Sequence, residues 1–184
     1  MRPMELKTPQ IGRDLAHLPV GVRERKDKTF TAGCEAGCTM KIYTIGFTKK
    51  TAERFFETLR ASGAKRLVDV RLNNVSQLAG FAKKQDLAYF LGRICGMDYL
   101  HLPVLAPTKD ILDEYKKRKG DWQIYERAFL SLMRERGIEQ TVSRDILADS
   151  CLLCSEDKPE HCHRRLVAEY LKEQWSDVDI CHLG

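Results

Sequence analysis

Short apolar runs alternate with amphipathic stretches from Met40 to the end of the sequence. The runs are rich in β-branched and aromatic residues and end at glycine, proline or polar residues, which is typical of strands. Strands separated by helical patterns indicate βαβ units and a mostly parallel sheet. The sequence therefore predicts a three-layer α/β sandwich with about five strands, Rossmann-like or flavodoxin-like. The predicted strands are residues 41–46, 66–71, 98–103, 150–154 and 177–183.

The stretches between these runs carry apolar residues at helical spacing. The first predicted helix begins near Ala52, with Thr48 or Thr51 as its N-cap, and ends at Gly63. Later helices are expected before Gly96, around residues 110–118, over residues 122–136 and after residue 163. One stripe of five apolar residues predicts a buried helix face rather than a ligand cage. It consists of Trp122, Tyr125, Phe129, Leu132 and Met133.

The chain divides into two parts by this pattern. Residues 1–39 show little periodicity and carry mixed charges, so we expect a poorly ordered N-terminal extension. Residues 40–184 are expected to form a single α/β domain, a size that buries one substantial core.

Composition excludes some classes of protein and leaves others open. The sequence is 43% apolar and 31% charged. It has no apolar run near the ~20 residues of a membrane helix. It also shows no apolar signal-peptide core, so we expect a cytoplasmic protein that does not bind membranes. The net charge of +5 permits an anionic small molecule or a nucleic acid as partner without requiring either.

The cysteines favour reduced thiols over a disulfide framework. Their number is seven, which is odd, and the chain is large enough to fold without disulfides. Three of them fall inside predicted helices or strands and are expected to be buried: Cys95, Cys151 and Cys181.

Side chains suited to catalysis or ligand binding lie at or just after the ends of the predicted strands. In open parallel sheets ligands bind beyond the carboxyl ends of the strands, since right-handed crossovers bring those loops to one edge. We therefore expect one pocket that combines several loops. The residues it gathers are Thr48, Asp69, Arg71, His101, Cys154 and Glu156, followed by Cys162, His163 and Arg164 at the start of the last helix.

The residue types in this pocket suggest thiol chemistry on an anion. A helix N-terminus favours anions and lowers thiol pKa values, and Cys162 and His163 should lie there. The predicted catalytic residues are Cys154 or Cys162 as nucleophile, with Glu156 or His163 as proton carrier. Cys154 and Cys162 could also close as a redox pair. The predicted ligand-binding residues are Arg71, Arg164, Asp69, Thr48, Phe81 and His101.

A metal site is the alternative for the same cysteines. The spacing C-x2-C-x7-C-H resembles a zinc pattern, but Cys151 and Cys154 lie three apart on a strand and point to opposite faces. Adjacent residues such as Cys162 and His163 rarely both reach one tetrahedral ion. We predict no cofactor, with zinc on Cys154, Cys162 and His163 as the alternative. Cys34 and Cys38 are too weak a signal to add.

Several motifs resemble the domain-of-unknown-function 488 (DUF488) family over residues 40–184. They are KIYTIG, LVDVR, Phe81, DYLHLPVLAPT and, most specifically, L-C-x-E…P-x-x-C-H-R, met by Leu153, Cys154, Glu156, Pro159, Cys162, His163 and Arg164. The resemblance implies an α/β fold with a site at the matching positions, and no reaction. Many members carry Gly-His-Ser in the first loop, where this sequence has Gly46, Phe47 and Thr48. LVDVR is also similar to a strand of rhodanese-like sulfurtransferases, although no compact anion-cradling loop follows Cys154 here.

Three functions remain open from the sequence. The preferred one is a Cys/His/Arg pocket that binds an anionic group, such as the phosphate of a nucleotide or nucleic acid, with or without catalysis by a cysteine. The second is a non-catalytic nucleic-acid-binding protein that uses the basic run at residues 116–119. The third is a structural zinc site on Cys154 and Cys162.

Overall fold

The computed structural model describes residues 39–75 and 79–184, and the predicted extension at residues 1–39, including Cys34 and Cys38, falls almost entirely outside them. The five strands are β1 Met40–Gly46, β2 Arg66–Asp69, β3 Asp98–His101, β4 Ser150–Cys154 and β5 Val178–His182. The α-helices are α1 Ala52–Ser62, α2 Lys84–Phe90, α3 Lys109–Lys116, α4 Trp122–Glu135, α5 Ile138–Thr141, α6 Arg144–Leu147 and α7 His163–Trp175. Three short helical turns, η1 Gly80–Ala82, η2 Leu91–Cys95 and η3 Pro103–Leu105, complete the described part.

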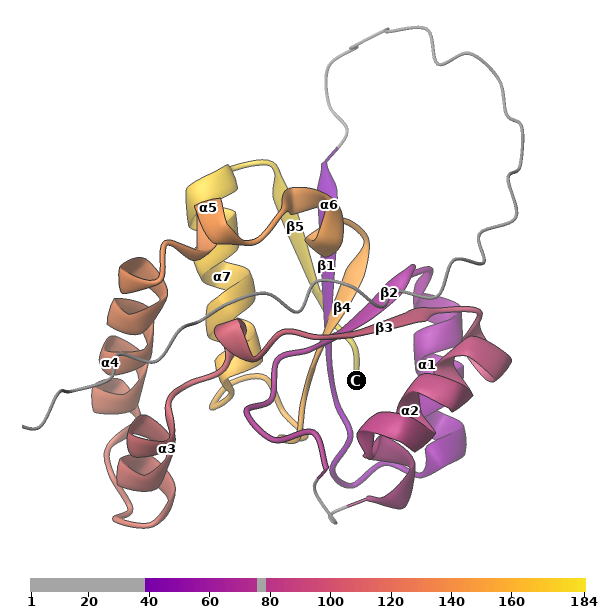
Figure 1. Ribbon diagram of the computed structural model, residues 1–184, viewed down its shortest axis with the longest axis horizontal. Helices are drawn as coiled ribbons and strands as arrows, with labels where there is room; N and C mark the ends of the chain where they lie inside the picture. The colour runs from indigo at the N-terminus through magenta and orange to yellow at the C-terminus, as the bar shows by residue number, and fades with distance from the viewer. Residues whose placement is uncertain (1–38, 76–78) are drawn as a thin grey trace, which may run out of the picture. The chain divides into compact units, whose positions relative to one another are not determined.

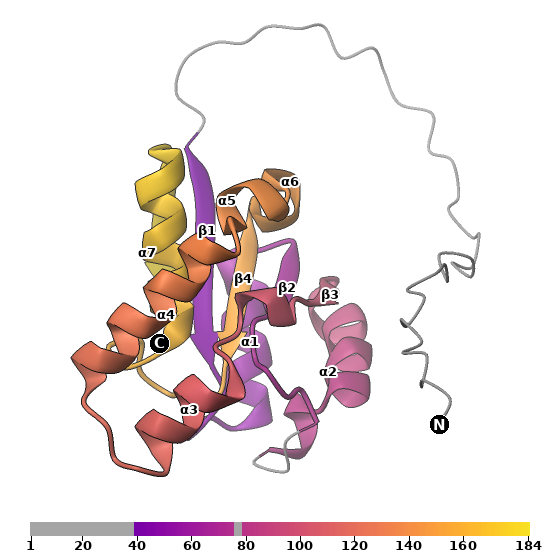
Figure 2. The same cartoon turned by 60° about the vertical axis from the view of Figure 1, so that its left-hand side comes forward.

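All five strands are parallel and lie in the order β3-β2-β4-β1-β5. Helices α1 and α2 cover one face of this sheet and α4 and α7 cover the other, as Figures 1 and 2 show. The predicted three-layer α/β sandwich is therefore confirmed. The strand order differs from the 3-2-1-4-5-6 of the nucleotide-binding Rossmann fold, because β4 inserts between β1 and β2.

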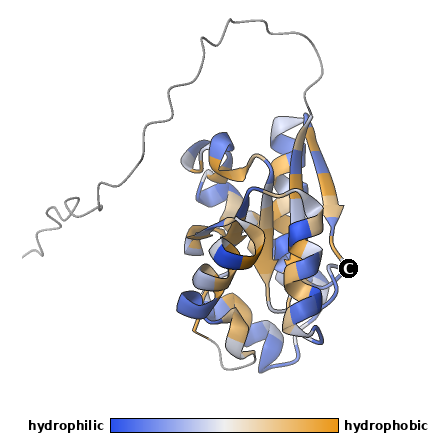
Figure 3. Cartoon of the chain, turned by 90° about the vertical axis from the view of Figure 1, so that its right-hand side faces the viewer, coloured by the Kyte–Doolittle hydropathy of each residue, from blue (hydrophilic) through white to orange (hydrophobic). Residues whose placement is uncertain are grey.

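Strand β4 is the central strand, and all five of its residues are buried. A strand that is covered on both faces does not alternate between polar and apolar residues. Figure 3 shows the apolar segments in the interior of the domain. Cys151 packs in the core beneath α1 and α2, as expected, and Leu152 packs on the opposite side with α4 and α7. Cys154 therefore ends the strand in the middle of the sheet edge, where loops from β1 and β2 meet it.

Helix α1 begins and ends close to the capping residues that the sequence predicts. Thr51, rather than Thr48, caps α1 by accepting a hydrogen bond from the Arg54 backbone amide at 3.2 Å. Gly63 ends α1 with φ of 77°, a left-handed conformation that costs glycine little.

Strand β2 is shorter than the predicted 66–71, because Arg71 turns back and its amide donates to the Asp69 carboxylate at 3.1 Å. This turn aims the Arg71 side chain out of the sheet.

The apolar stripe of α4 is only partly a core face. Tyr125, Phe129 and Met133 are buried, as predicted. Trp122 and Leu132 are half-buried, and Trp122 stacks on Tyr125 with ring centroids 5.0 Å apart. Figure 2 shows α3 and α4 extending beyond the carboxyl edge of the sheet. The first turn of α4 is therefore free to form the wall of a cavity instead of the core.

Two further observations concern the burial of Cys181 and the length of the helices. Cys181 is exposed on β5, not buried as expected, since β5 is an edge strand with one open side. Within the described residues, none of the helices has the length and apolar character to cross a lipid bilayer.

Candidate thiol site

A cavity of about 210 Å³ lies beyond the carboxyl ends of β2 and β4. Its floor is formed by the ends of these strands and the start of α7, and its outer wall by the α3–α4 hairpin. Five of the predicted site residues line it. The complete lining is Arg71, Leu72, Asn73, Pro107, Leu112, Tyr115, Lys116, Trp122, Tyr125, Cys154, Ser155, Glu156, His161, Cys162 and His163.

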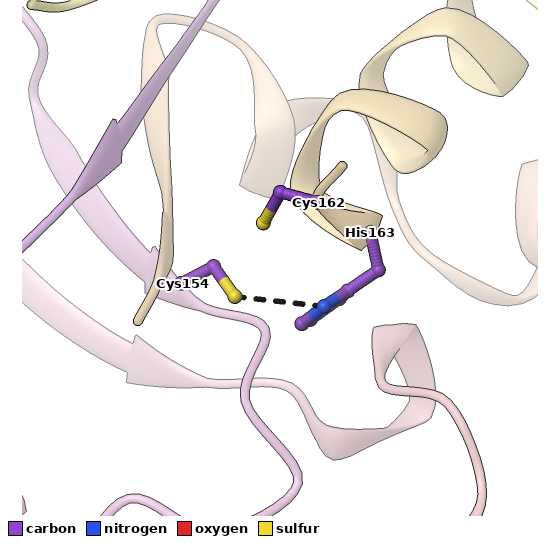
Figure 4. A group of neighbouring side chains, drawn as sticks. All are labelled: Cys154, Cys162 and His163. Atoms are coloured by element: carbon purple, nitrogen blue, oxygen red, sulfur yellow. Dashed lines mark hydrogen bonds between the residues drawn. The ribbon is translucent and has the colours of Figure 1, made fainter. Parts of the chain in front are cut away.

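Cys154 and His163 form the chemical centre of this cavity. The Cys154 Sγ atom lies 3.5 Å from His163 Nδ1, and both side chains are buried (Figure 4). The other ring nitrogen, Nε2, lies 2.9 Å from the Val70 carbonyl oxygen. A carbonyl only accepts hydrogen bonds, so Nε2 carries a proton and Nδ1 faces the sulfur. Cys154, His163 and the Val70 carbonyl are thus arranged like the nucleophile, base and orienting group of a cysteine–histidine catalytic pair.

The electrostatics of the pair favour a thiolate on Cys154. Burial raises the pKa of this thiol, but hydrogen bonding from Cys162 and the charge of His163 hold it well below its ordinary range. Burial lowers the pKa of His163, and the adjacent Cys154 sulfur more than offsets this, so its pKa is raised. The lowered pKa of Cys154 and the raised pKa of His163 agree with a thiolate next to an imidazolium ion.

Cys162 completes a three-residue cluster. It is the N-cap of α7, as the sequence predicts, and its sulfur, the Cys154 sulfur and a His163 ring nitrogen all lie within 4.8 Å of one another. Adjacency in the sequence, which was expected to disfavour a shared metal ion, does not keep these two side chains apart. The reason is that Cys162 is extended, with φ of −136° and ψ of 135°, and only His163 is helical. Burial and the neighbouring Cys154 raise the pKa of Cys162 well above its usual range.

Arg71 is the cation of the cavity wall, and Asp69 holds it in place. Its Nε donates to an Asp69 carboxylate oxygen at 2.7 Å and its Nη2 to the Ala82 carbonyl at 2.9 Å. The other carboxylate oxygen accepts a hydrogen bond from the Tyr99 hydroxyl at 2.8 Å. Asp69 is fully buried and occupied by these donors, so it positions Arg71 rather than a ligand.

One nitrogen of Arg71 is left over. Its Nη1 is buried and has no hydrogen-bond partner within the part of the chain that the structure describes. The guanidinium also lies over the Phe47 ring, 5.2 Å from its centroid. A buried N–H group without a partner costs roughly 1–3 kcal/mol. An acceptor at this position would remove that cost.

Arg164 lies behind the cavity, where it fixes the loop between β4 and α7. It is 1% exposed, its Nη2 donates to the Asp157 carbonyl at 3.0 Å and its Nη1 to the Glu156 carbonyl. Nη1 also approaches the Cys162 sulfur at 3.2 Å. Thr48 supports the same loop, since its hydroxyl and its amide both donate to the Ser155 carbonyl.

Gly46 allows this loop to pass close to β1. A Cβ atom at this position would lie 1.7 Å from the Glu156 carbonyl oxygen, which the backbone of the loop cannot yield easily. We expect Gly46→Ala to lower the free energy of unfolding by about 1–3 kcal/mol, because such overpacking displaces the backbone. Urea denaturation measures this, with Gly92→Ala as control, since nothing lies within 4 Å of its added Cβ. Equal stability of the two variants would contradict the close approach.

Of three further predicted residues, Glu156 lines the cavity, whereas His101 and Phe81 do not. Glu156 is at the rim, where its carboxylate pairs with Lys116 at 2.8 Å. His101 binds the Arg71 carbonyl oxygen through Nε2 at 2.8 Å and so supports that loop. Phe81 packs on the rings of Phe55 and Phe56 beneath the sheet, at 5.3 and 5.8 Å between centroids.

Basic residues 116–119 were the predicted contact for nucleic acid. Three of the four side chains pair with carboxylates of the chain itself: Lys116 with Glu156, Lys117 with Asp113 and Arg118 with Glu114. The last two pairs follow i,i+4 helical spacing, which stabilises exposed helices. The run is thus largely neutralised locally, and Lys116 belongs to the cavity rim.

Sequence reasoning missed the aromatic wall and His161. Tyr115, Trp122 and Tyr125 pack with centroids 4.9 to 5.5 Å apart, and the His161 ring lies 5.0 Å from that of Trp122. The apolar stripe of α4 indicated Trp122 and Tyr125, but as part of a core face. Only the docking of the α3–α4 hairpin at the sheet edge turns part of it toward the cavity.

Comparison with known proteins agrees with the motifs. The family described as domain of unknown function DUF488 matches residues 51–171, which include α1, β2, β3, β4 and most of α7. Strands β1 and β5 lie outside the matched region. No curated protein and no solved structure gives a significant match. The family match covers most of the chain and contains the entire L-C-x-E…P-x-x-C-H-R motif, so this protein belongs to the DUF488 family.

Proposed function

We propose that this protein is an enzyme that uses Cys154 as a nucleophile on a small substrate whose anionic group binds Arg71. The observation that carries the proposal is the contact of 3.5 Å between Cys154 Sγ and His163 Nδ1 on the floor of a cavity. A thiol with an oriented base at hydrogen-bond distance is the usual arrangement for covalent cysteine catalysis.

The contacts of His163 support its role as proton carrier. The Val70 carbonyl keeps the proton on Nε2, so Nδ1 can take the Cys154 proton. The resulting thiolate attacks the electrophilic atom of the substrate and forms a covalent bond to it. His163 then returns the proton to the leaving group. The Phe129 ring lies edge-on to the imidazole, 5.8 Å between centroids, and helps keep water from the pair.

The unpartnered Nη1 of Arg71 supports an anionic group on the substrate. Carboxylate, phosphate and sulfate oxygens each form strong hydrogen bonds with a guanidinium. Lys116 on the rim adds a second cation, although Glu156 neutralises much of its charge. A phosphate-type group, as in a nucleotide, fits this chemistry.

Protection from alkylation tests the proposal. We expect inorganic phosphate to slow labelling of Cys154 by iodoacetamide, since the anion on Arg71 blocks the cavity. Asp69→Asn combined with Arg71→Met removes both charges of the buried pair and should abolish protection while the protein stays folded. Arg60→Ala, an exposed residue on α1, is the matched control and should retain protection. Protection that survives loss of Arg71 would overturn the anion-binding role.

A zinc site is the second candidate, favoured by the three donor atoms within 4.8 Å. Two thiolates and an imidazole would leave an open fourth position on the metal. The buried guanidinium of Arg164, 3.2 Å from the Cys162 sulfur, and that of Arg71 disfavour a dication, since both add positive charge. Metal analysis of the purified protein decides between them. Stoichiometric zinc that is lost in both Cys154→Ser and Cys162→Ser would replace the thiol proposal.

A further inference from the structure

Cys162 has no task in the reaction proposed above, although it lies against the nucleophile. Its side chain is 1% exposed, it lines the same cavity, and its sulfur is within 4.8 Å of the Cys154 sulfur. In Figure 4 the Cys154 side chain projects toward the His163 ring and the Cys162 sulfur lies beside this pair, with Cys154 at the end of β4 and Cys162 at the start of α7. A second thiol at this distance can do more than donate a hydrogen bond.

We propose that Cys154 and Cys162 form a redox dithiol that reduces hydroperoxides, with Cys162 as the resolving thiol. The inference rests on the nucleophilic Cys154 of the proposed function and adds a second activity to the same cavity. The product of the oxidation is an intramolecular disulfide between these two residues.

The first step uses Cys154 and His163. The Cys154 thiolate attacks one oxygen of the peroxide, a sulfur–oxygen bond forms and the oxygen–oxygen bond breaks. With hydrogen peroxide the departing hydroxide takes the proton of the His163 imidazolium and leaves as water, and with an organic hydroperoxide the departing alkoxide leaves as an alcohol in the same way. Cys154 is oxidised to the sulfenic acid and the peroxide is reduced. Arg71, whose Nη1 has no hydrogen-bond partner among the described residues, stabilises the negative charge that develops on the peroxide oxygens.

The second step uses Cys162. Neutral His163 takes the Cys162 proton, and the Cys162 sulfur attacks the Cys154 sulfur of the sulfenic acid. The sulfur–oxygen bond breaks, and the hydroxide takes the proton and leaves as a second water. Arg164 Nη1, 3.2 Å from the Cys162 sulfur, stabilises the transient thiolate. A thiol reductant from solution returns the disulfide to two thiols, at the cost of its own oxidation.

The surroundings direct the disulfide to this one pair. The sulfurs must approach from at most 4.8 Å to the ~2.05 Å of a disulfide. The other described thiols lie elsewhere: Cys151 in the core beneath α1 and α2, Cys95 bonded to the Phe56 carbonyl at 3.4 Å, and Cys181 on the edge strand β5. Arg164 fixes the connecting loop at its Glu156 and Asp157 carbonyls, so both thiols are held at their positions.

Peptide mapping of the full-length protein after hydrogen peroxide tests this inference. We expect reduced protein to give a peptide pair linked through Cys154 and Cys162, two hydrogens lighter than the separate thiols and restored by dithiothreitol. In Cys162→Ser the linked pair should disappear, and Cys154 should be trapped by dimedone as the sulfenic acid. The matched control, Cys181→Ser, should give the linked pair at the level of the unmodified protein.

The outcomes separate this inference from the proposed function. Sulfenic acid trapped on Cys154 of the unmodified protein, without the linked pair, overturns the role of Cys162 but leaves Cys154 as a nucleophile. A disulfide between Cys154 and any other cysteine overturns it equally. If Cys154 reacts with neither peroxide nor iodoacetamide, the nucleophile itself is absent and both proposals fall.

Discussion

Cys154→Ser is expected to remove the fast phase of iodoacetamide labelling and to slow the initial rate on the order of 100-fold. The reason is that alkylation requires a thiolate, and the cluster around Cys154 stabilises one at neutral pH. Two of the other described thiols are less reactive, because burial raises the pKa of Cys95 and of Cys151. Site-resolved mass spectrometry after short labelling times measures the rate for each cysteine.

The control for this experiment is Cys181→Ser. That thiol lies on β5, away from the cavity, and its loss should leave the fast phase intact. A fast phase that persists in Cys154→Ser would show that another cysteine is the reactive one. Circular dichroism of both variants checks that the fold is retained, as expected for a substitution that differs by one atom.

The second large effect is a shift of the pH profile in His163→Asn. In the unmodified protein the lowered pKa of Cys154 keeps the thiolate populated below the ~8.5 of a free thiol. The raised pKa of His163 keeps the imidazolium populated above its ordinary ~6.5. The ion pair therefore exists between the lowered pKa of Cys154 and the raised pKa of His163. Acid removes it by protonating Cys154, and alkali removes it by deprotonating His163 but leaves the thiolate.

Removal of the imidazole removes one of the interactions that lower this pKa. The labelling rate of Cys154 in His163→Asn should fall about 10-fold or more at pH 6, since one pKa unit is a tenfold change in thiolate. The rate should recover toward the unmodified value in alkaline solution. The control is His182→Asn, because His182 binds Thr44 on β1 and lies outside the cavity. An unchanged profile in His163→Asn would refute the ion pair.

The residues behind the cavity explain why so many polar groups are buried at one edge of the sheet. Asp69 is occupied by Arg71 and Tyr99, and Arg164 by the carbonyls of the loop. Buried charges are tolerated when they are paired and hydrogen-bonded in this way. Each of these pairs positions a residue that lines the cavity, either Arg71 directly or Cys162 through its loop.

The amino-acid sequence by itself determined the fold class and the edge of the sheet at which the candidate site residues gather. Strand β4 was predicted with its observed limits, since five consecutive apolar or small residues bounded by polar ones have few alternatives. The glycine that ends α1 followed from local capping chemistry, and the start of the last helix near Cys162 followed from the apolar pattern after it. The gathering of Arg71 and Cys154 followed from the parallel sheet alone, because the carboxyl ends of parallel strands share an edge.

Only the tertiary structure decided which of these residues face one another. Periodicity fixes backbone conformation, but whether His163 turns its ring to Cys154 depends on the Val70 carbonyl, 93 positions away in the sequence. The same holds for Trp122, which a helical stripe places in the core and the docking of α3 and α4 places at a cavity. Side-chain partnership depends on long-range packing, so the pairing of Cys154 with His163 and Cys162 emerges only when the whole domain is folded.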